Sequence, residues 1–232
     1  MTHLHAIEAN AIAYYWELAR CLGGQFNAQE AIIWFTTGRR SLPRFNGVLR
    51  TVVARPEHVG RVVQPAACRA RQILDIACGC AIKSFALAQV SPSVQIICLD
   101  SPAVLEVARD LARRMGIVAR VVWRPANLLT ADLGVSKFDA ALVGQITHYL
   151  TPEQNRDLFR RIHAALKPGG TLVLGCPMAG AAPEETTCFL TLFLWANGGG
   201  GAHAFAMYRA WLSDSRFQAV TPLSDRSLAA QK

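Results

Sequence analysis

The sequence predicts an α/β protein with a doubly wound, mainly parallel sheet, and two stretches of the chain carry that prediction. The first is an apolar strand at 72–77 that ends in a turn of small residues and continues into a helix at 82–90. The second is an apolar strand at 94–100 that ends in Asp100, 21 residues after Gly79. A strand, a tight turn and a helix in this order place backbone N–H groups where a ligand can approach closely. An acid at the tip of the next strand can bind ribose hydroxyls, so a cofactor that contains a nucleoside is expected.

Strands and helices continue to alternate along the rest of the chain. We expect helices at 102–115, 152–166, 188–196 and 205–212, strands at 118–123, 138–143, 171–174, 217–221 and 226–230, and a turn at 167–170. In the first of these helices the apolar residues recur at helical spacing, and Gly116 follows them. Strands that alternate with helices are typical of a parallel sheet with right-handed crossovers.

The first 70 residues have a different pattern. Ala6 to Cys21 contains good helix formers, and Gly23-Gly24 ends that stretch. Residues 34–48 contain glycine, proline and Asn-Gly, which favour a loop. We therefore expect a mainly helical N-terminal extension or cap at 1–70, followed by a cofactor-binding domain at 71–232.

Composition narrows the classes of protein that the chain can belong to. The 232 residues are 52% hydrophobic and 17% charged, which suits a large core. The net charge is +8, and much of the excess lies before residue 72, at Arg39, Arg40, Arg44, Arg50, Arg55, Arg61, Arg69 and Arg71. No aromatic-interleaved RNA-binding motif accompanies these arginines, so a solvated surface is favoured over nucleic-acid binding.

The sequence also suggests where the protein resides. No apolar run approaches the ~18 to 20 residues of a membrane helix, and no signal peptide is evident at the N-terminus. The seven cysteines are odd in number and contain no Cys-x-x-Cys pair of the zinc type. They predict reduced thiols in a cytoplasmic protein, without a membrane partner and without a metal site.

The turn after the first strand resembles a known family. Its pattern, Asp75-x-Ala77-x-Gly79-x-Ala81, resembles the Asp-x-Gly-x-Gly-x-Gly turn of class I S-adenosylmethionine-dependent methyltransferases, with alanine at two glycine positions. Alanine disfavours the positive φ that glycine adopts freely. Asp100 resembles the ribose-binding acid of the family.

Later segments resemble the same family in the same order. Arg124–Leu128 resembles the segment that holds the adenine amino group, and residues 138–150 and 166–173 resemble the fourth strand, the next helix and the fifth strand. The resemblance covers about residues 71–230 and is nearest to small-molecule O-methyltransferases of the plant and bacterial type. It implies a Rossmann-like, seven-stranded sheet whose last strand is antiparallel.

The resemblance assigns roles to individual residues. S-adenosyl-L-methionine would be the cofactor, with Asp100 on its ribose, Asn127 on its adenine and the Ala77–Ala81 turn beside its methionine part. The residues that the resemblance implies for cofactor binding are Asp75, Ala77, Gly79, Ala81, Asp100, Ser101, Asn127, Leu128 and Gln145. An alternative stays open for three of them. Asp75 and Asp100 could brace a turn, and asparagine, as at Asn127, is common in turns.

Transfer of a methyl group to a hydroxyl usually needs a base, most often histidine. In the plant-type family a histidine stands at the position that Ala196 occupies here. His148 and, second, His203 are the candidate substitutes. Such relatives also carry a winged-helix dimerisation domain that residues 1–70 do not resemble. Residues 34–48 resemble a segment that precedes some GNAT acetyltransferase domains, but no pyrophosphate turn for acetyl-CoA follows them, so no activity is implied.

The leading hypothesis is a cytoplasmic S-adenosylmethionine-dependent methyltransferase that acts on a small molecule, with oxygen as the acceptor atom and homodimerisation left open. The runner-up is a non-catalytic relative that binds the cofactor weakly or not at all. The turn spacing disfavours a nicotinamide-dependent oxidoreductase. A nucleic-acid methyltransferase is kept open by the positive charge alone.

Overall fold

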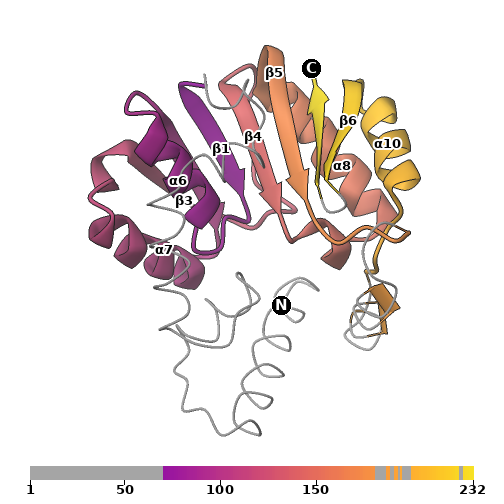
Figure 1. The fold of residues 1–232 in the computed structure, drawn as a ribbon, viewed down its shortest axis with the longest axis horizontal. Helices are drawn as coiled ribbons and strands as arrows, with labels where there is room; N and C mark the ends of the chain where they lie inside the picture. Colours follow the sequence, from indigo (N-terminus) through magenta and orange to yellow (C-terminus); the bar gives the residue numbers. More distant parts are fainter. Residues whose placement is uncertain (1–69, 181–186, 189–190, 193, 195–199, 225–226) are drawn as a thin grey trace, which may run out of the picture.

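The computed structural model of the chain describes residues 70–180, 187–188, 191–192, 194, 200–224 and 227–232. Seven strands form one sheet in the order β3-β2-β1-β4-β5-β7-β6 (Figure 1). The strands are β1 (Gln72–Ile76), β2 (Gln95–Asp100), β3 (Val121–Pro125), β4 (Phe138–Gly144), β5 (Leu166–Gly175), β6 (Gln218–Ser224) and β7 (Ser227–Gln231). The helices are α6 (Ile82–Val90), α7 (Pro102–Arg114), α8 (Pro152–Ala165) and α10 (Phe205–Asp214), with short 3-10 turns η1 (Val118–Arg120) and η2 (Thr147–Tyr149).

The direction of the strands confirms the predicted fold class. Strand β1 lies between β2 and β4 and is parallel to both, while β7 is antiparallel to β5 and to β6. The order of the strands therefore reverses between β1 and β4. In open α/β sheets a ligand binds outside the carboxyl ends of the strands at such a reversal. The ends of β1 and β4 are accordingly where a site is expected.

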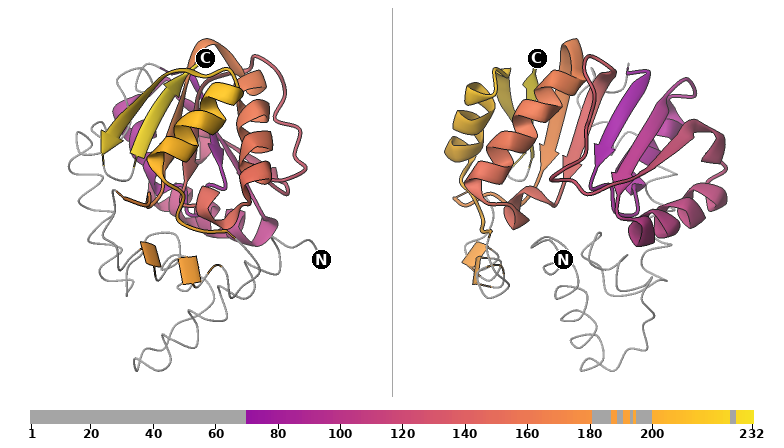
Figure 2. Two further views of the ribbon diagram at one scale, coloured as in Figure 1. Left: turned by 90° about the vertical axis from the view of Figure 1, so that its right-hand side faces the viewer. Right: turned by 180° about the vertical axis from the view of Figure 1, so that it is seen from behind.

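Helices cover both faces of the sheet, so the central strands are buried on both sides (Figure 2). One core joins the sheet to α8 and α10, and a second joins it to α6 and α7. Because successive side chains of a strand point to opposite faces, Ile73 belongs to one core and Leu74 to the other. This explains why β1 reads as a continuous apolar run rather than an alternating one.

The helices begin and end at residues that suit those positions. At the start of α8 the Thr151 side chain accepts a hydrogen bond from Gln154 N, and the Gln154 side chain accepts one from Thr151 N, which forms a capping box. Helix α7 starts with Pro102, which suits a first helical turn. It is followed by Gly116 at a φ of 67°.

Several predicted boundaries differ from the structure, and two of the differences change the kind of element. The strand predicted at 118–123 is the turn η1 followed by β3, so the strand starts three residues later and ends two residues later. The turn predicted at 167–170 lies inside β5, where the pairing with β4 shifts register between Phe138 and Ala140. Gly169 has a φ of 75°, and a Cβ at Gly170 would lie 2.9 Å from the Lys167 carbonyl oxygen. The two glycines thus form an irregularity within the strand instead of ending it.

Several predictions fall where the structure describes little or nothing. The N-terminal extension at 1–69 and most of the predicted helix at 188–196 lie outside the described residues and stay predictions. Among the described helices, none combines the length and apolarity needed to cross a membrane. The same residues contain no group of three or more side chains suited to hold a metal ion.

Candidate functional site

The turn between β1 and α6 adopts the backbone shape that three glycines would favour. Ala77, Gly79 and Ala81 have φ angles of 52°, 57° and 53°, which lie in the left-handed region. Ala81 N donates a hydrogen bond to the Cys78 carbonyl at 2.8 Å and closes the turn. A left-handed conformation costs an alanine about 1–2 kcal/mol. The structure therefore holds two alanines in strained conformations next to the site, and such strain clusters at functional positions.

Asp100 ties this turn to the end of β2. One carboxylate oxygen accepts a hydrogen bond from Gly79 N at 2.8 Å, and the other accepts one from Ser101 N at 2.7 Å. The side chain is buried, and burial raises the pKa of Asp100 while the two N–H groups oppose that rise. The carboxylate keeps further lone pairs with which it can accept hydrogen bonds from a ligand.

Asp75 lies within β1, one residue before its end, and connects this strand to the first turn of α6. It accepts a hydrogen bond from the Ser84 hydroxyl, and both side chains are buried. Burial raises the pKa of Asp75 to about 7, while the Ser84 hydrogen bond and the Lys83 ammonium pull it down and the Asp100 carboxylate adds to the rise. Asp75 therefore titrates near neutral pH.

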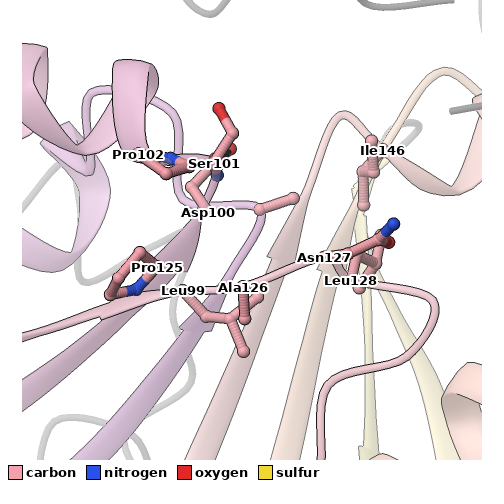
Figure 3. Close-up of a pocket in the computed structure, with 10 residues that line it drawn as sticks. Leu99, Asp100, Ser101, Pro102, Pro125, Ala126, Asn127, Leu128 and Ile146 are labelled. Carbon is pink, nitrogen blue, oxygen red and sulfur yellow. Dashed lines mark hydrogen bonds between the residues drawn. The ribbon is translucent and has the colours of Figure 1, made fainter. Parts of the chain in front are cut away.

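A pocket of about 180 Å³ lies beside Asp100 at the carboxyl ends of the strands (Figure 3). Its lining is made mostly of apolar residues: Ala77, Leu99, Asp100, Ser101, Pro102, Pro125, Ala126, Asn127, Leu128 and Ile146. Five of the nine residues predicted for cofactor binding, Ala77, Asp100, Ser101, Asn127 and Leu128, are among them. The volume is below the ~300–1,000 Å³ of whole small-molecule sites, so it suits one part of a larger ligand.

The other four predicted residues do not line this pocket. Gly79 N donates to the Asp100 carboxylate, Asp75 accepts a hydrogen bond from the Ser84 hydroxyl, and Ala81 N closes the turn on the Cys78 carbonyl. Gln145 is exposed and has a φ of 59°, and its N–H donates to the Gly175 carbonyl at 2.7 Å. Gln145 directly follows β4, so left-handed residues follow both strands that flank the reversal.

Sequence reasoning missed the apolar half of the pocket. Leu99 and Pro102 flank the predicted pair Asp100–Ser101, and Pro125–Ala126 precedes Asn127. Their position next to polar residues at strand ends was the available signal. Ile146 follows β4 and comes from a distant part of the sequence, so only the sheet order places it here.

Asn127 serves a turn and lines the pocket at once. Its Oδ1 accepts a hydrogen bond from Leu129 N at 2.9 Å, and its carbonyl accepts from the N–H groups of Thr130 and Ala131. A side-chain oxygen bonded to the N–H two residues later is an Asx turn. The two alternative roles considered from the sequence are therefore compatible.

His148 is on the opposite side of the reversal, in η2 after β4. Its side chain is 4% exposed, and Nδ1 has no hydrogen-bond partner among the described residues. Burial lowers the pKa of His148 to about 3, with a smaller contribution from the charge of His203. The ring is therefore neutral at physiological pH.

A strap formed by residues 200–204 covers His148. Gly201 N donates to the His148 carbonyl at 2.8 Å, and His203 Nε2 lies 3.3 Å from the Leu150 carbonyl oxygen. The His203 ring meets the Trp211 ring edge-on, with centroids 4.9 Å apart. Burial lowers the pKa of His203, against the opposing effect of the Leu150 carbonyl. We call this group of His148, the strap and its aromatic neighbours the histidine cluster.

Comparison with known proteins identifies the domain. Residues 73–170 match the family described as "methyltransferase domain". A carboxy-S-adenosyl-L-methionine synthase of Trichlorobacter lovleyi is 27% identical over 183 residues, which are 75% of this chain and 70% of that protein.

Solved structures share the fold at low sequence identity. An O-methyltransferase family protein from Burkholderia thailandensis matches with a TM-score of 0.68 at 20% identity, over 81% of this chain and 57% of that one. Human N-acetylserotonin methyltransferase, solved in complex with S-adenosylmethionine, matches with a TM-score of 0.64 at 15% identity, over 97% of this chain and 67% of that one. The chain therefore spans little more than half of the first structure and two thirds of the second.

Residues 73–170 thus form a methyltransferase domain, and the chain has the fold of the S-adenosylmethionine-dependent methyltransferases. The predicted resemblance to a methyltransferase domain and the predicted fold are confirmed. The roles of individual site residues, the acceptor and the division at residue 70 stay predictions.

Proposed function

We propose that this protein binds S-adenosyl-L-methionine and transfers its methyl group to a hydroxyl of a small molecule. The observation that carries the proposal is the position of Asp100. Its carboxylate lines a pocket at the carboxyl ends of the strands, and N–H groups of Gly79 and Ser101 hold it in place. A fixed carboxylate at the end of the second strand can accept hydrogen bonds from the two hydroxyls of a ribose.

The residues around Asp100 suit the rest of this cofactor. Leu99, Pro125 and Ala126 offer apolar surface for a purine, and Asn127 offers an amide at the edge of the same pocket. Ala77 continues the lining toward β1, where the methionine part would lie. When bound, the cofactor supplies an electrophilic methyl group. The task of the chain is then to position the acceptor oxygen in line with that methyl group.

An oxygen acceptor is supported by the solved structures that share the fold, several of which are named as O-methyltransferases. The pocket described above is too small for a cofactor and an acceptor together, so the acceptor would lie outside it. We further propose that the acceptor is a small molecule and that residues 1–70 form an extension separate from the methyltransferase domain. A cytoplasmic location and homodimerisation belong to the same proposal.

The two predicted bases are poorly suited to accept a proton. A base whose conjugate acid has a pKa of about 3, as for His148, would take a proton from a phenol of pKa ~10 only at a cost of about 9 kcal/mol. The pKa of His203 is lowered by burial as well. His148 and His203 remain predicted bases, but their environment favours a different route to the reactive oxygen.

A second candidate function comes from the curated relative that aligns over 183 residues. That protein is named for making a modified cofactor, carboxy-S-adenosyl-L-methionine, rather than for methylating an acceptor. Mass spectrometry of the cofactor, after incubation of the protein with a hydroxylated acceptor or with a carboxyl donor, would separate the two, because only the second candidate retains the methyl carbon on sulfur.

Calorimetric titration with S-adenosylmethionine, S-adenosylhomocysteine and NADH tests the proposal directly. We expect binding of the first two in the micromolar range and none of NADH. Binding of NADH alone, or of no ligand by a folded sample, would contradict the proposal and favour the nicotinamide-dependent or the non-catalytic alternative.

Two variants of Asp100 sharpen this titration. Because hydrogen bonds to a charged group contribute about 1.5–3 kcal/mol, Asp100→Ala should weaken S-adenosylhomocysteine binding roughly ten- to hundredfold. Asp100→Asn keeps the size of the side chain and should weaken binding too, with a smaller effect on thermal unfolding. Asp110→Ala, which removes an exposed acid paired with Arg114 on α7, is the matched control and should leave affinity unchanged. Equal affinity in all four proteins would exclude Asp100 from the cofactor site.

A further inference from the structure

Lys83 places a positive charge over the carboxyl ends of three neighbouring strands. It is the second residue of α6, and its side chain is exposed. A Cβ at Gly144, the last residue of β4, would lie 3.7 Å from Lys83 Nζ. The charge of the same ammonium opposes the rise in the pKa of Asp75 on β1 and of Cys176, which follows β5. The ammonium therefore lies beside the reversal between β1 and β4.

This ammonium has no fixed anion among the described side chains. None of the ion pairs between described residues includes Lys83. Asp75, the carboxyl group whose pKa it lowers, is hydrogen-bonded to the Ser84 hydroxyl and titrates at about pH 7. An exposed lysine with no anionic partner is ordinary on a surface, but this one lies at the end of β4, beside the strand reversal where ligands of open α/β sheets bind.

The charge at this position restricts what can bind. The sulfonium of the proposed cofactor is itself a cation, and two like charges near each other repel. An oxyanion between them would be attracted by both. The neutral, buried His148 offers no comparable charge, so Lys83 is the described cation best placed to stabilise such an anion.

We propose that Lys83 is a catalytic residue of the acceptor site, whose ammonium donates a hydrogen bond to the acceptor oxygen and holds it as an oxyanion. The inference rests on the proposed methyl transfer to oxygen. The acceptor proton leaves to solvent before transfer. A lone pair of the oxyanion then forms the O–CH₃ bond while the S–CH₃ bond breaks and its electron pair stays on sulfur, giving a methyl ether and neutral S-adenosylhomocysteine.

Among the residues that the structure describes, three ionisable groups interact with Lys83 directly or through a neighbour, and they enter any test against pH. They are Asp75 on β1, Cys176 after β5, and Asp100, which acts through Asp75. Asp75 itself ionises near pH 7, so its negative charge grows across the range of interest. A variant that removes this titration, Asp75→Asn, therefore belongs in the experiment beside the variants of Lys83.

The probe is 4-nitrophenol, whose phenolate absorbs visible light and whose phenol does not. It is titrated with pH in the presence of the protein saturated with S-adenosylhomocysteine. We expect the bound probe to ionise at least one pH unit lower than the free probe, a tenfold stabilisation of the phenolate. Lys83→Met should abolish that shift, and Lys83→Arg should keep part of it. Lys137→Met, which removes an exposed lysine in the loop before β4, should behave like the parent protein.

Cofactor affinity distinguishes a role of Lys83 in acceptor binding from a role in cofactor binding. Lys83→Met should bind S-adenosylhomocysteine as the parent protein does. If the variant instead loses affinity for S-adenosylhomocysteine but not for methylthioadenosine, Lys83 binds the carboxylate of the cofactor and the inference fails. It also fails if Lys83→Met keeps the full shift or if the parent protein shows none. Absence of S-adenosylhomocysteine binding by the parent protein would overturn the proposed function, and this inference with it.

Discussion

The two sides of the strand reversal bury ionisable groups in opposite ways. On the cofactor side, Asp75 and Asp100 are buried acids that accept hydrogen bonds from a hydroxyl and from backbone N–H groups. In the histidine cluster, His148 and His203 are buried bases surrounded by aromatic rings and backbone carbonyls, and His148 Nδ1 lacks a described partner.

Burial favours the neutral form of the ionisable groups on both sides. Among the described residues, only those of the cofactor side include hydrogen-bond donors that stabilise the charged form, a carboxylate. The pKa of the acids is raised and that of the bases is lowered. Donors aimed at Asp100 reduce the cost of its negative charge, so it can meet a ligand as an anion. In the histidine cluster, the Leu150 carbonyl opposes the lowering of the His203 pKa only in part, and no described group does so for His148. We therefore expect the side with Asp75 and Asp100 to bind the cofactor and the histidine cluster to support the fold.

The pH dependence of stability should separate the two sides most clearly. The pKa of Asp75 is raised from 3.8 to about 7, so its stabilising contribution is complete below pH 3.8 and is lost as pH rises through about 7. The pKa of His148 is lowered from 6.5 to about 3, so its contribution is complete above pH 6.5 and is lost as pH falls through about 3. Between about pH 4 and 6.5 the two effects oppose each other, each by about 1.4 kcal/mol per pH unit.

Removing either Asp75 or His148 should therefore leave the pH dependence of the free energy of unfolding that the other one causes. In Asp75→Asn, the free energy of unfolding should fall by about 3 kcal/mol as pH is lowered from 6.5 to 4. In His148→Leu, it should instead rise by about 4 kcal/mol as pH is lowered from 7 to 4. Urea unfolding at several pH values measures both. Parallel slopes in the two variants and the parent protein would show that these groups are not buried as described.

A substitution in the strap should destabilise the histidine cluster and leave the cofactor side unchanged. Gly200 has a φ of 99°, and a Cβ there would lie 2.3 Å from the His148 carbonyl oxygen. Gly180 has a φ of 79° with nothing within 4 Å of its Cβ position, so Gly180→Ala is the matched control. We expect Gly180→Ala to cost about 1 kcal/mol from its positive φ, and Gly200→Ala about 3 kcal/mol because crowding adds to strain.

Denaturant unfolding and calorimetry together test this difference. The free energy of unfolding should drop in Gly200→Ala while the affinity of the folded protein for S-adenosylhomocysteine stays within twofold. A loss of cofactor affinity equal to the loss seen for Asp100→Ala would mean that the two sides are one coupled unit, contrary to the comparison.

The smallest expected effect concerns the strained turn on the cofactor side. Ala77→Gly removes a methyl group from a residue with a φ of 52°, so it should stabilise the protein by about 1 kcal/mol. Ala126→Gly changes an alanine of the same pocket that lies outside the left-handed region, and it should cost up to about 1 kcal/mol instead. Thermal unfolding of both variants gives the two signs, and a loss of stability in Ala77→Gly would argue against stored strain in the turn.

Local patterns were sufficient for the frame of the molecule and for part of its site. The strand, turn and helix around Gly79 and the acid at Asp100 follow from neighbouring residues, because apolar runs, small-residue turns and strand ends are set over a few positions. The resemblance to a known family then implied seven strands and an antiparallel last strand, and the structure confirms both. Five of the predicted cofactor residues line the pocket because they lie at strand ends, which local patterns locate.

Features that join distant segments came from the packed structure alone. The burial of His148 depends on a strap more than 50 residues later in the chain, and the reach of Lys83 over Gly144 depends on β1 lying next to β4. Burial also decides that Asp75 titrates near neutral pH and that His148 stays neutral. Composition and spacing do not report how much water surrounds a side chain, since desolvation is a property of the assembled core rather than of any short stretch of sequence.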